Sequence, residues 1–253
     1  MRTLLLGLVV GFVATTSAQA AERMTPELLW KLGRLGSSCV DSEGKLMAFA
    51  VRHYNLEENS GTSAIHVMDL ETKKQRELLG NLTSAGALQF VDRPDGLQLF
   101  FEGMPADSKN GKSQVWAIDP KGGQPQQITS LESGVSNLKV SPTGKHLAFT
   151  AEVKMDKTVN EIYADLPKAD ARIIDSLMYR HWNAWHDYAF THLHVVSLND
   201  DGTVGEVVDL MDGIRANCPL PPFGGAEQFN WSPDGEQIAY TAKVVNNPAE
   251  STD

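Results

Sequence analysis

The stretch SPDGEQIAYT (232–241) is one of four similar stretches in the chain, and together they decide the fold. The other three read DSEGKLMAFA (41–50), RPDGLQLFFE (93–102) and SPTGKHLAFT (141–150). Their shared glycines are Gly44, Gly96, Gly144 and Gly235, so the spacing is 52, 48 and then 91 residues. Self-similarity at such a period is the sequence signature of a repeat architecture.

Each of the four stretches predicts a β-hairpin. In three of the four, proline at the second position presets φ for a turn, and Asp or Thr followed by Gly completes it. The residues after the glycine alternate in polarity, as Leu147 and Phe149 or Ile238 and Tyr240 show, which is typical of a strand. Another apolar segment precedes each turn, so a strand enters and a strand leaves.

A second shared element follows three of these hairpins. It reads SAIHVMDLETKKQREL (63–78), SQVWAIDPKGGQPQQIT (113–129) and THLHVVSLNDDGTVGEVV (191–208). Each copy is a strand, a polar turn and a short strand. Two hairpins give four antiparallel strands in about 45–50 residues, which is the size of a β-propeller blade. The sequence therefore predicts an all-β fold.

The 91-residue spacing contains one second-hairpin element rather than two. We therefore interpret residues 152–190 as an insertion inside the third blade. The expected blades are about 37–82, 88–131, 137–212 and 226–253, after a lead segment at 21–36. The fourth has room for its first hairpin alone, so we expect an incomplete propeller of three blades plus half of a fourth. A β-sandwich with coincidental turns is the alternative, and four copies with a matched second element disfavour it.

The N-terminal residues predict export. MRTLLLGLVVGFVATTSAQA (1–20) has a basic residue, an apolar run and a small-x-small end, as in a secretory signal peptide. We expect cleavage after Ala20 and a secreted or periplasmic protein that has no membrane contact after cleavage. A retained anchor is the alternative, but the run 4–14 is shorter than the roughly 20 residues of a spanning helix.

Composition excludes some partners. The net charge of −10 argues against nucleic acid and against anionic membranes, which both attract basic surfaces. Two cysteines, Cys39 and Cys218, are too few for a disulfide-built scaffold, so the core must be hydrophobic. Whether these two pair stays open.

Three flanking stretches carry a family resemblance. They are MTPELLWKLGRLGSSCVDSEGKLMAFAVRHYNLEEN (24–59), RHWNAWHDY (180–188) and CPLPPFGGAEQFNWSPDG (218–235). They resemble the prolyl oligopeptidase family of serine peptidases, in its branch of dipeptidyl peptidase 5 and acylaminoacyl-peptidase-like exopeptidases. The resemblance implies a propeller that limits access to short peptides. It also implies a following α/β-hydrolase domain, as the partner of the propeller, with a Ser-Asp-His triad.

The chain departs from the family where the nucleophile should be. A nucleophile elbow needs G-x-S-x-G. The partial matches Gly61-Thr62-Ser63, Gly111-Lys112-Ser113 and Gly134-Val135-Ser136 lack the closing glycine. We therefore assign no catalytic residue and expect the chain to be inactive alone.

The insertion carries the candidate substrate-binding residues. Because the family binds the free amino end of a peptide, carboxylates must meet an ammonium group, and Glu161, Asp165, Asp175 and Asp187 have that chemistry. The match to the family favours Arg180, Trp182 and Asp187, with Trp185 as a further apolar wall; these four and Glu161 are the predicted site. The alternative is that the tryptophans pack the insertion onto its blade and the acids are solvated.

Four histidines lie at 181, 186, 192 and 194. His192 and His194 would share a strand face, a spacing that zinc sites use, but no HExxH accompanies them. We expect packing or surface roles, and no metal or cofactor. Two rival functions stay open: a stand-alone periplasmic propeller that binds a protein partner, and, as the weakest, a metal-dependent enzyme.

Overall fold

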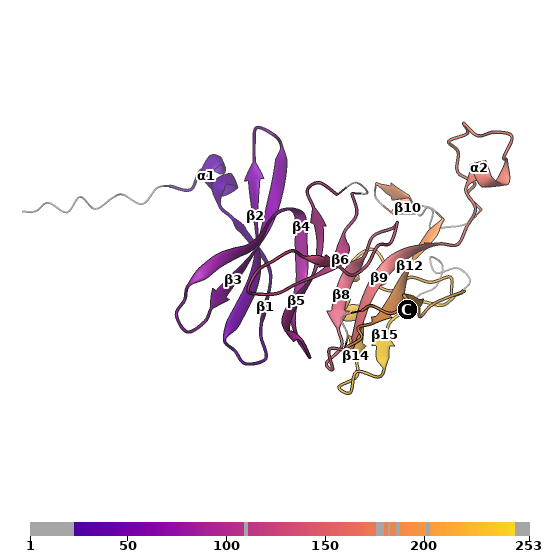
Figure 1. Ribbon diagram of the computed structural model, residues 1–253. Coiled ribbons are helices and arrows are strands. Elements are labelled where there is room, and N and C mark those ends of the chain that lie inside the picture. Colours follow the sequence, from indigo (N-terminus) through magenta and orange to yellow (C-terminus); the bar gives the residue numbers. More distant parts are fainter. Residues whose placement is uncertain are drawn as a thin grey trace, which may run out of the picture.

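The computed structural model describes residues 23–108, 111–175, 180–181, 183–185, 188–200 and 203–245 (Figure 1). The predicted signal peptide lies outside this part of the chain. The helices are α1 (Pro26–Lys31), α2 (Val159–Ile162) and the 3-10 helix η1 (Ala226–Gln228). A first group of strands comprises β1 (Arg34–Val40), β2 (Leu46–Asn55), β3 (Ser60–Asp69), β4 (Gln75–Arg93), β5 (Gly96–Pro105), β6 (Gln114–Ile118) and β7 (Gln126–Gln127). The other strands are β8 (Ser136–Val140), β9 (His146–Lys154), β10 (Arg180–His181), β11 (Ala184–Trp185), β12 (Ala189–Ser197), β13 (Val208–Asp209), β14 (Phe229–Trp231) and β15 (Ile238–Tyr240).

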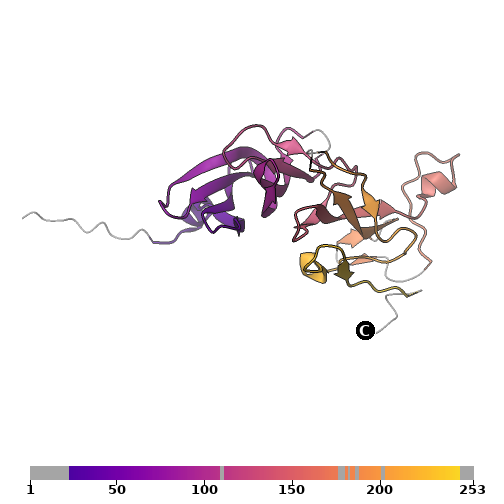
Figure 2. The same ribbon diagram turned by 60° about the horizontal axis from the view of Figure 1, so that its bottom comes forward.

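The strands form an open series of antiparallel sheets, which confirms the all-β, incomplete propeller fold. Strands β1 to β7 make one seven-stranded sheet, β13-β12-β9-β8 a four-stranded sheet, and β14 and β15 a hairpin. Figure 2 shows these sheets following one another along an arc, from the indigo first blade to the yellow fourth. The arc does not close into a ring within the described residues.

The first two blades share one strand, which the sequence does not predict. Strand β4 pairs with β3 from Gln75 to Leu82 and with β5 from Leu82 to Arg93. Irregular pairing between Leu82 and Ser84 and between Gly86 and Gln89 lets the strand change partners, because a bulge bends and twists a strand. The second blade therefore begins without a loop.

The repeated turns hold their hairpins by a shared side-chain contact. The first residue of the motif accepts a hydrogen bond from the amide five residues on: Asp41 from Leu46, Ser141 from His146 and Ser232 from Gln237, at 2.9–3.0 Å. The glycine that follows adopts a positive φ, as at Gly144 (68°) and Gly235 (73°), which glycine tolerates best. These contacts confirm the predicted hairpins and explain the Ser or Asp at their start.

Arg93 stands where the other copies have Ser or Asp, and its turn differs. Arg93 pairs directly with Gly96 across a two-residue loop. Its guanidinium instead donates to the carbonyl oxygens of Gly144 and Leu198 in the third blade, at 3.3 and 3.4 Å, and also to that of Asn199. A turn contact is replaced here by a contact between blades.

The hydrophobic core lies between successive blades. Along β5, Leu99 and Phe101 pack toward the first blade while Phe100 packs toward the third. Along β9, Phe149 faces the second blade and Ala148 faces the fourth. Each central strand is therefore apolar on both faces, as a sheet stacked on both sides requires.

The first strands of successive blades contact one another through side chains. Gln89 of β4 donates to the carbonyl of Leu138 at 3.0 Å and accepts from the amide of Val140 at 2.9 Å. Lys139 of β8 in turn donates to the carbonyl of Phe229 on β14 at 2.7 Å. Side chains thus satisfy backbone groups that no strand partner reaches.

The motif turns of successive blades lie at one end of the sheets. The Ser42 hydroxyl donates to Asp92 at 2.7 Å, and Gly235 packs close to Thr143. We call this the turn end. Helix α1, the β2–β3 loop and the connection from β9 to β12 lie at the opposite end, which we call the insertion end (Figure 1).

Among the residues that the structure describes, no helix has the length and apolar character needed to cross a membrane.

Candidate functional site

The connection between β9 and β12 holds the predicted site residues. Its base is closed because Lys154 pairs with Ala189, and the amides of Met155 and Asp156 donate to the carbonyl of Tyr188 at 2.8 and 3.0 Å. The segment 155–188 therefore leaves the blade and returns to it at one point, without breaking the sheet.

An ion pair fixes this base to the chain beyond β13. Both guanidinium nitrogens of Arg215 donate to the carboxylate of Asp156 at 2.9 Å, and the same group stacks 5.2 Å from the ring of Phe190. Bidentate pairs of this kind set orientation as well as distance. The sequence does not single out this pair, because its partners are 59 residues apart.

Glu161 lies in α2 and its carboxylate is already in use. It accepts hydrogen bonds from the amide and hydroxyl of Thr158, at 2.7 and 3.0 Å, in a capping box. Lys154 donates to both carboxylate oxygens at 2.5 Å. The bonds from Lys154 and Thr158 lower the pKa of Glu161 to about 2. In this arrangement Glu161 begins a helix and pairs with a lysine.

Arg180 and Trp185 are brought together. They pair across the β10–β11 hairpin, and the guanidinium carbon of Arg180 lies 5.9 Å from the centre of the indole ring. The guanidinium carbon of Arg172 lies 4.6 Å from the same ring. Cation–π contacts at this range are attractive, so two arginine side chains pack on the indole of Trp185.

The five predicted site residues are therefore only partly placed. Arg180 and Trp185 form one group, whereas α2, which carries Glu161, is drawn apart from the β10–β11 hairpin in Figure 1. Trp182 and Asp187 lie outside the described residues. A role of these five in substrate binding stays a prediction.

Exposed apolar side chains gather at the insertion end. Those around α1 and the β2–β3 loop are Met24, Leu29, Trp30, Leu32, Leu35, Tyr54 and Leu56, and those of the insertion are Ile162, Tyr163, Leu166, Ile173, Ile174 and Trp185. The two groups do not adjoin, because α1 and α2 lie on opposite sides of the molecule in Figure 1. Exposed apolar side chains that cluster are common places of contact with another surface.

The partial nucleophile motifs fall on blade strands or next to them. Ser63 is buried in β3, where the guanidinium of Arg52 donates to its hydroxyl at 3.4 Å. Ser113 immediately precedes β6 and Ser136 begins β8. None of the three stands on the strand-to-helix turn that a nucleophile elbow requires.

The two described histidines of β12 are packed inside the third blade. His192 is buried with its Nδ1 2.8 Å from a carboxylate oxygen of Asp209, and His194 stacks on Phe149 with ring centres 5.8 Å apart. Burial lowers the pKa of His194. In the described residues no three His, Cys, Asp or Glu side chains stand close enough to hold a metal ion. Cys39 and Cys218 are both free thiols.

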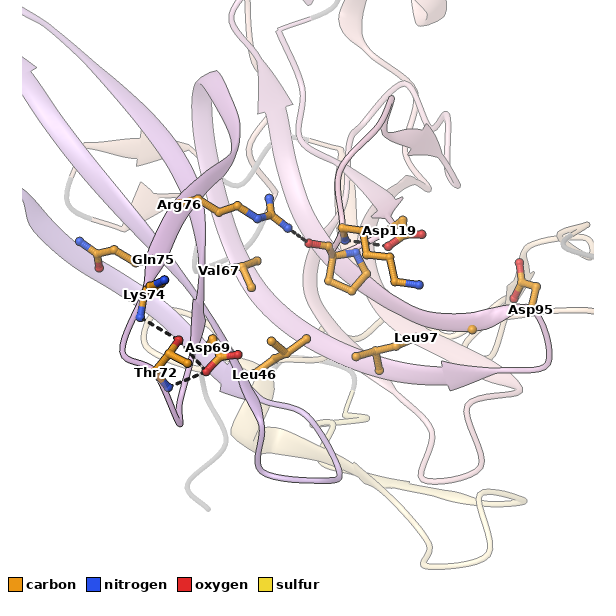
Figure 3. Close-up of a pocket in the computed structure, with 13 residues that line it drawn as sticks. Leu46, Val67, Asp69, Thr72, Lys74, Gln75, Arg76, Asp95, Leu97 and Asp119 are labelled. Atoms are coloured by element: carbon orange, nitrogen blue, oxygen red, sulfur yellow. Dashed lines mark hydrogen bonds between the residues drawn. The ribbon is translucent and has the colours of Figure 1, made fainter.

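A groove opens at the turn end, between the β3–β4 hairpin of the first blade and the β4–β5 and β6–β7 turns of the second (Figure 3). Its volume is about 570 Å³. The residues that line it are Leu46, Val67, Asp69, Thr72, Lys74, Gln75, Arg76, Asp95, Gly96, Leu97, Asp119, Pro120 and Lys121. We call it the turn-end groove. The sequence does not reveal it, because its walls are the polar turns of two different blades.

The fold and the insertion together define the class: a β-propeller segment with a large connection inside its third blade. No family model matches the chain. It is 28% identical over 246 residues to dipeptidyl-peptidase 5 of Porphyromonas gingivalis, a match that covers 96% of this chain and 35% of the relative. Dipeptidyl-peptidase 5 of Aspergillus fumigatus is 28% identical over 244 residues, covering 92% and 33%.

Solved structures show the same fold. An acylaminoacyl peptidase in complex with Z-Gly-Gly-Phe-chloromethyl ketone superposes with a TM-score of 0.54 at 15% identity, covering 83% of this chain and 28% of that one. The acylaminoacyl peptidase of Pyrococcus horikoshii gives a TM-score of 0.51 at 16% identity, covering 72% and 26%.

These matches confirm the resemblance predicted from the sequence. The chain resembles the N-terminal, propeller portion of the prolyl oligopeptidase family, in its dipeptidyl-peptidase 5 and acylaminoacyl-peptidase branch. It spans about a third of the length of the curated relatives that it matches.

Proposed function

We propose that this chain is the propeller portion of an exported serine exopeptidase that removes dipeptides or acylated residues from the N-termini of short peptides. The similarity to dipeptidyl-peptidase 5 over 96% of the chain carries the proposal. Only 35% of that relative is covered, and in the proposed enzyme the nucleophile, its histidine and its aspartate would lie in a hydrolase domain in the part that this chain does not match.

In the proposed enzyme the insertion end faces the hydrolase domain. The exposed apolar side chains of α1 and of the insertion support this orientation, because they lie at the end where a second domain would bury them. The propeller would then limit access to the catalytic serine by its ring and by the insertion. Acyl transfer itself would follow the triad and oxyanion-hole chemistry of serine peptidases.

The insertion would bind the substrate beside its reacting bond. Trp185 offers an apolar wall, and Arg180, stacked on it, offers guanidinium donors for a peptide carbonyl. Binding of the substrate's amino end would fall to acidic residues of the insertion, among them the predicted Asp187. Glu161 would take part only by giving up its bonds to Lys154 and Thr158.

Two measurements test the proposal. The gene is read beyond the codon of Asp253; we expect a continuing frame with further blades and a G-x-S-x-G. A stop codon there in an intact gene would refute it. The purified chain is also assayed on dipeptide substrates, and we expect no turnover, because the proposal puts the nucleophile elsewhere. Clear turnover would mean that this portion holds its own nucleophile.

The role of the insertion needs a separate test in the full-length enzyme. Trp185→Ala and Arg180→Gln should raise KM about tenfold or more, roughly 1.4 kcal/mol of lost binding. Lys31→Gln is the matched control, because Lys31 is an exposed cation of α1 at the same end of the sheets but outside the insertion. An equal rise of KM in the control would remove the insertion from substrate binding.

A further inference from the structure

Two arginines, Arg34 and Arg52, stand directly opposite each other at the insertion end. They are Cα partners in the antiparallel pair of β1 and β2, and both are partly buried. We call them the arginine pair. Side chains of directly opposite residues lie on the same face of a sheet, and like charges in that position are destabilising. The pair therefore lowers stability unless another group offsets its charge.

Two aromatic rings hold the arginine pair in place. The guanidinium carbon of Arg52 lies 5.3 Å from the centre of the Tyr54 ring. That of Arg34 lies 6.0 Å from the same ring and 5.6 Å from the ring of Trp30. The two rings meet edge to face at 5.2 Å. Cation–π contacts offset part of the repulsion. Trp30 and Tyr54 are 41% and 37% exposed, so they also present apolar surface beside the charges.

The two guanidinium groups keep most of their hydrogen-bond donors. Within the described residues Arg34 donates no hydrogen bond and forms no ion pair. Arg52 donates to the carbonyl of Thr83 at 2.5 Å and to the hydroxyl of Ser63 at 3.4 Å. A guanidinium has five N–H donors, so a ligand that approaches the pair must supply acceptors.

No carboxylate of the described residues neutralises the arginine pair. The acids of the neighbouring elements are Glu27 in α1 and Glu57 and Glu58 in the β2–β3 loop. Glu58 accepts the hydroxyl of Ser60 at 3.3 Å, and none of the three forms an ion pair with either arginine. The turn-end groove differs in this respect, because three carboxylates there balance three cations. The arginine pair carries a net positive charge that an anion would offset.

One side of the arginine pair is closed by β4. Arg52 reaches the carbonyl of Thr83 in that strand, so a polypeptide could not continue past the pair in this direction. On the other side lies α1, where Leu29, Trp30 and Leu32 are exposed. An apolar side chain next to the anion would gain by covering this surface. A chain end needs room on one side alone, and it therefore fits the pair better than a continuing chain.

We propose that the arginine pair binds the C-terminal carboxylate of a short peptide whose last residue is apolar. The carboxylate accepts hydrogen bonds from both guanidinium groups, whose planar geometry matches it, and the last side chain packs on Trp30 and Tyr54. Binding also relieves the repulsion between the arginines. In the enzyme proposed above, the pair would hold the end of the substrate that is not cleaved. That role rests on the proposed function, whereas binding by this chain does not.

The probe is N-acetyl-Leu-Phe with a free carboxylate, titrated into the purified chain by calorimetry at low salt. We expect saturable binding that weakens with added salt, because exposed charges are screened. N-acetyl-Leu-Phe-amide has the same apolar groups without the charge, and it should bind at least about tenfold more weakly, roughly 1.4 kcal/mol. Equal binding of acid and amide would overturn the proposal.

Two further probes separate the sources of the anion. N-acetyl-Leu-Glu-Phe-amide carries an internal carboxylate and no charged end, and we expect it to bind at least about tenfold more weakly than the free acid. Equal affinity would mean that the pair takes acidic side chains rather than chain ends. Inorganic phosphate should compete poorly with the free acid; competition at the same concentration would mean a general anion site. Either result would overturn the proposal.

Protein variants locate the binding. Arg34→Gln should lower the affinity for the free acid at least about tenfold, and Arg34→Lys should restore part of it, because lysine keeps the charge without the planar fork. Lys31→Gln is the control, because it removes an exposed cation of α1 outside the pair. Equal affinity in Arg34→Gln and in the control would overturn the proposal, as would absence of saturation at roughly 10 mM probe.

Thermal unfolding of each variant checks that it folds, and the comparison of acid with amide uses the wild-type chain, so it stands whatever the variants do. The two proposals also fail separately. Binding by this chain, with no exopeptidase activity in the full-length protein, would refute the proposed function and keep the carboxylate site. Exopeptidase activity with no binding of the free acid would refute the site alone.

Discussion

The blade stack and the insertion of the third blade use their large side chains in opposite ways. In the stack, Phe100, Phe101 and Phe149 are at most 2% exposed. In the insertion, the large aliphatic and aromatic residues from Ile162 to Ile174 are about half exposed, and among the described residues of the segment 155–188 only Val159 is buried. The stack is stabilised by packing between blades, whereas the insertion is held by polar contacts at its base and by a capping box. The exposed apolar side chains of the insertion are therefore available for contact with another surface.

The largest expected difference between the two regions is in the free energy of unfolding that is lost when one large side chain is truncated in each. Phe149→Ala deletes a ring packed between the second and third blades and stacked on His194. It should lower the free energy of unfolding by about 3–5 kcal/mol. Ile174→Ala, at 48% exposure, should change it by less than about 0.5 kcal/mol.

Urea denaturation followed by tryptophan fluorescence measures both variants. A loss at Ile174 as large as that at Phe149 would mean that the insertion belongs to the folding core. Little loss at Phe149 would mean that the blades do not depend on the packing between them.

The features that the sequence predicts are local ones, and the features that it does not predict join distant segments. The hairpins follow from local chemistry, because turn residues and period-2 alternation act within ten residues. The capping box Thr158-Val159-Asn160-Glu161 is equally local. Its S/T-x-x-E pattern in the sequence indicates that Glu161 caps a helix. Reading it would have weakened the case for Glu161 as a substrate ligand.

Features made by two distant segments could not be predicted. The continuity of β4 through two blades depends on where its partners β3 and β5 lie, and no turn residue marks the change. The turn-end groove and the Asp156–Arg215 pair join segments that are far apart in sequence, and single-sequence periodicity has no information about such distances. The sequence therefore predicts the hairpins of each blade, but not the strand, groove and ion pair that connect separate parts of the chain.

An effect of intermediate size on the free energy of unfolding should distinguish turns that contact a neighbouring blade from turns that do not. Gly144 and Gly44 have nearly the same φ, 68° and 69°. An alanine at either position should lose about 1–2 kcal/mol from the left-handed conformation. A Cβ at Gly144 would also lie 2.9 Å from Cγ1 of Val91 in the second blade, whereas nothing lies within 4 Å at Gly44.

Gly144→Ala should therefore destabilise the chain more than Gly44→Ala, by about 1 kcal/mol or more of overpacking. Thermal unfolding of the two variants under one set of conditions makes the comparison, with Gly44→Ala as the matched control for backbone strain. Equal losses would show that the blades separate enough at this end to admit a methyl group.

The smallest effect concerns two carboxylates with opposite pKa shifts, one in each region. Glu102 of β5 lies at the contact with β8, and burial raises its pKa above 4.5, partly offset by the amides of Leu138 and Asn137. Glu161 is exposed, and its bonds to Lys154 and Thr158 lower its pKa to about 2. The folded state holds the Glu102 proton more tightly than the unfolded chain does, and the Glu161 proton less tightly.

Linkage then gives the two residues opposite signs. The contribution of Glu102 to stability is greatest below pH 4.5 and falls as the pH rises from 4.5 through its raised pKa, so Glu102→Gln should be more stable than the wild type at neutral pH. The contribution of Glu161 is complete above pH 4.5 and is lost as the pH falls toward 2, so Glu161→Gln should weaken α2 only above that window. Unfolding midpoints against pH test Glu102, and amide exchange in α2 tests Glu161. If both substitutions gave slopes of the same sign, the burial assigned to Glu102 would be wrong, and the blade contact at β5 and β8 would be open to water.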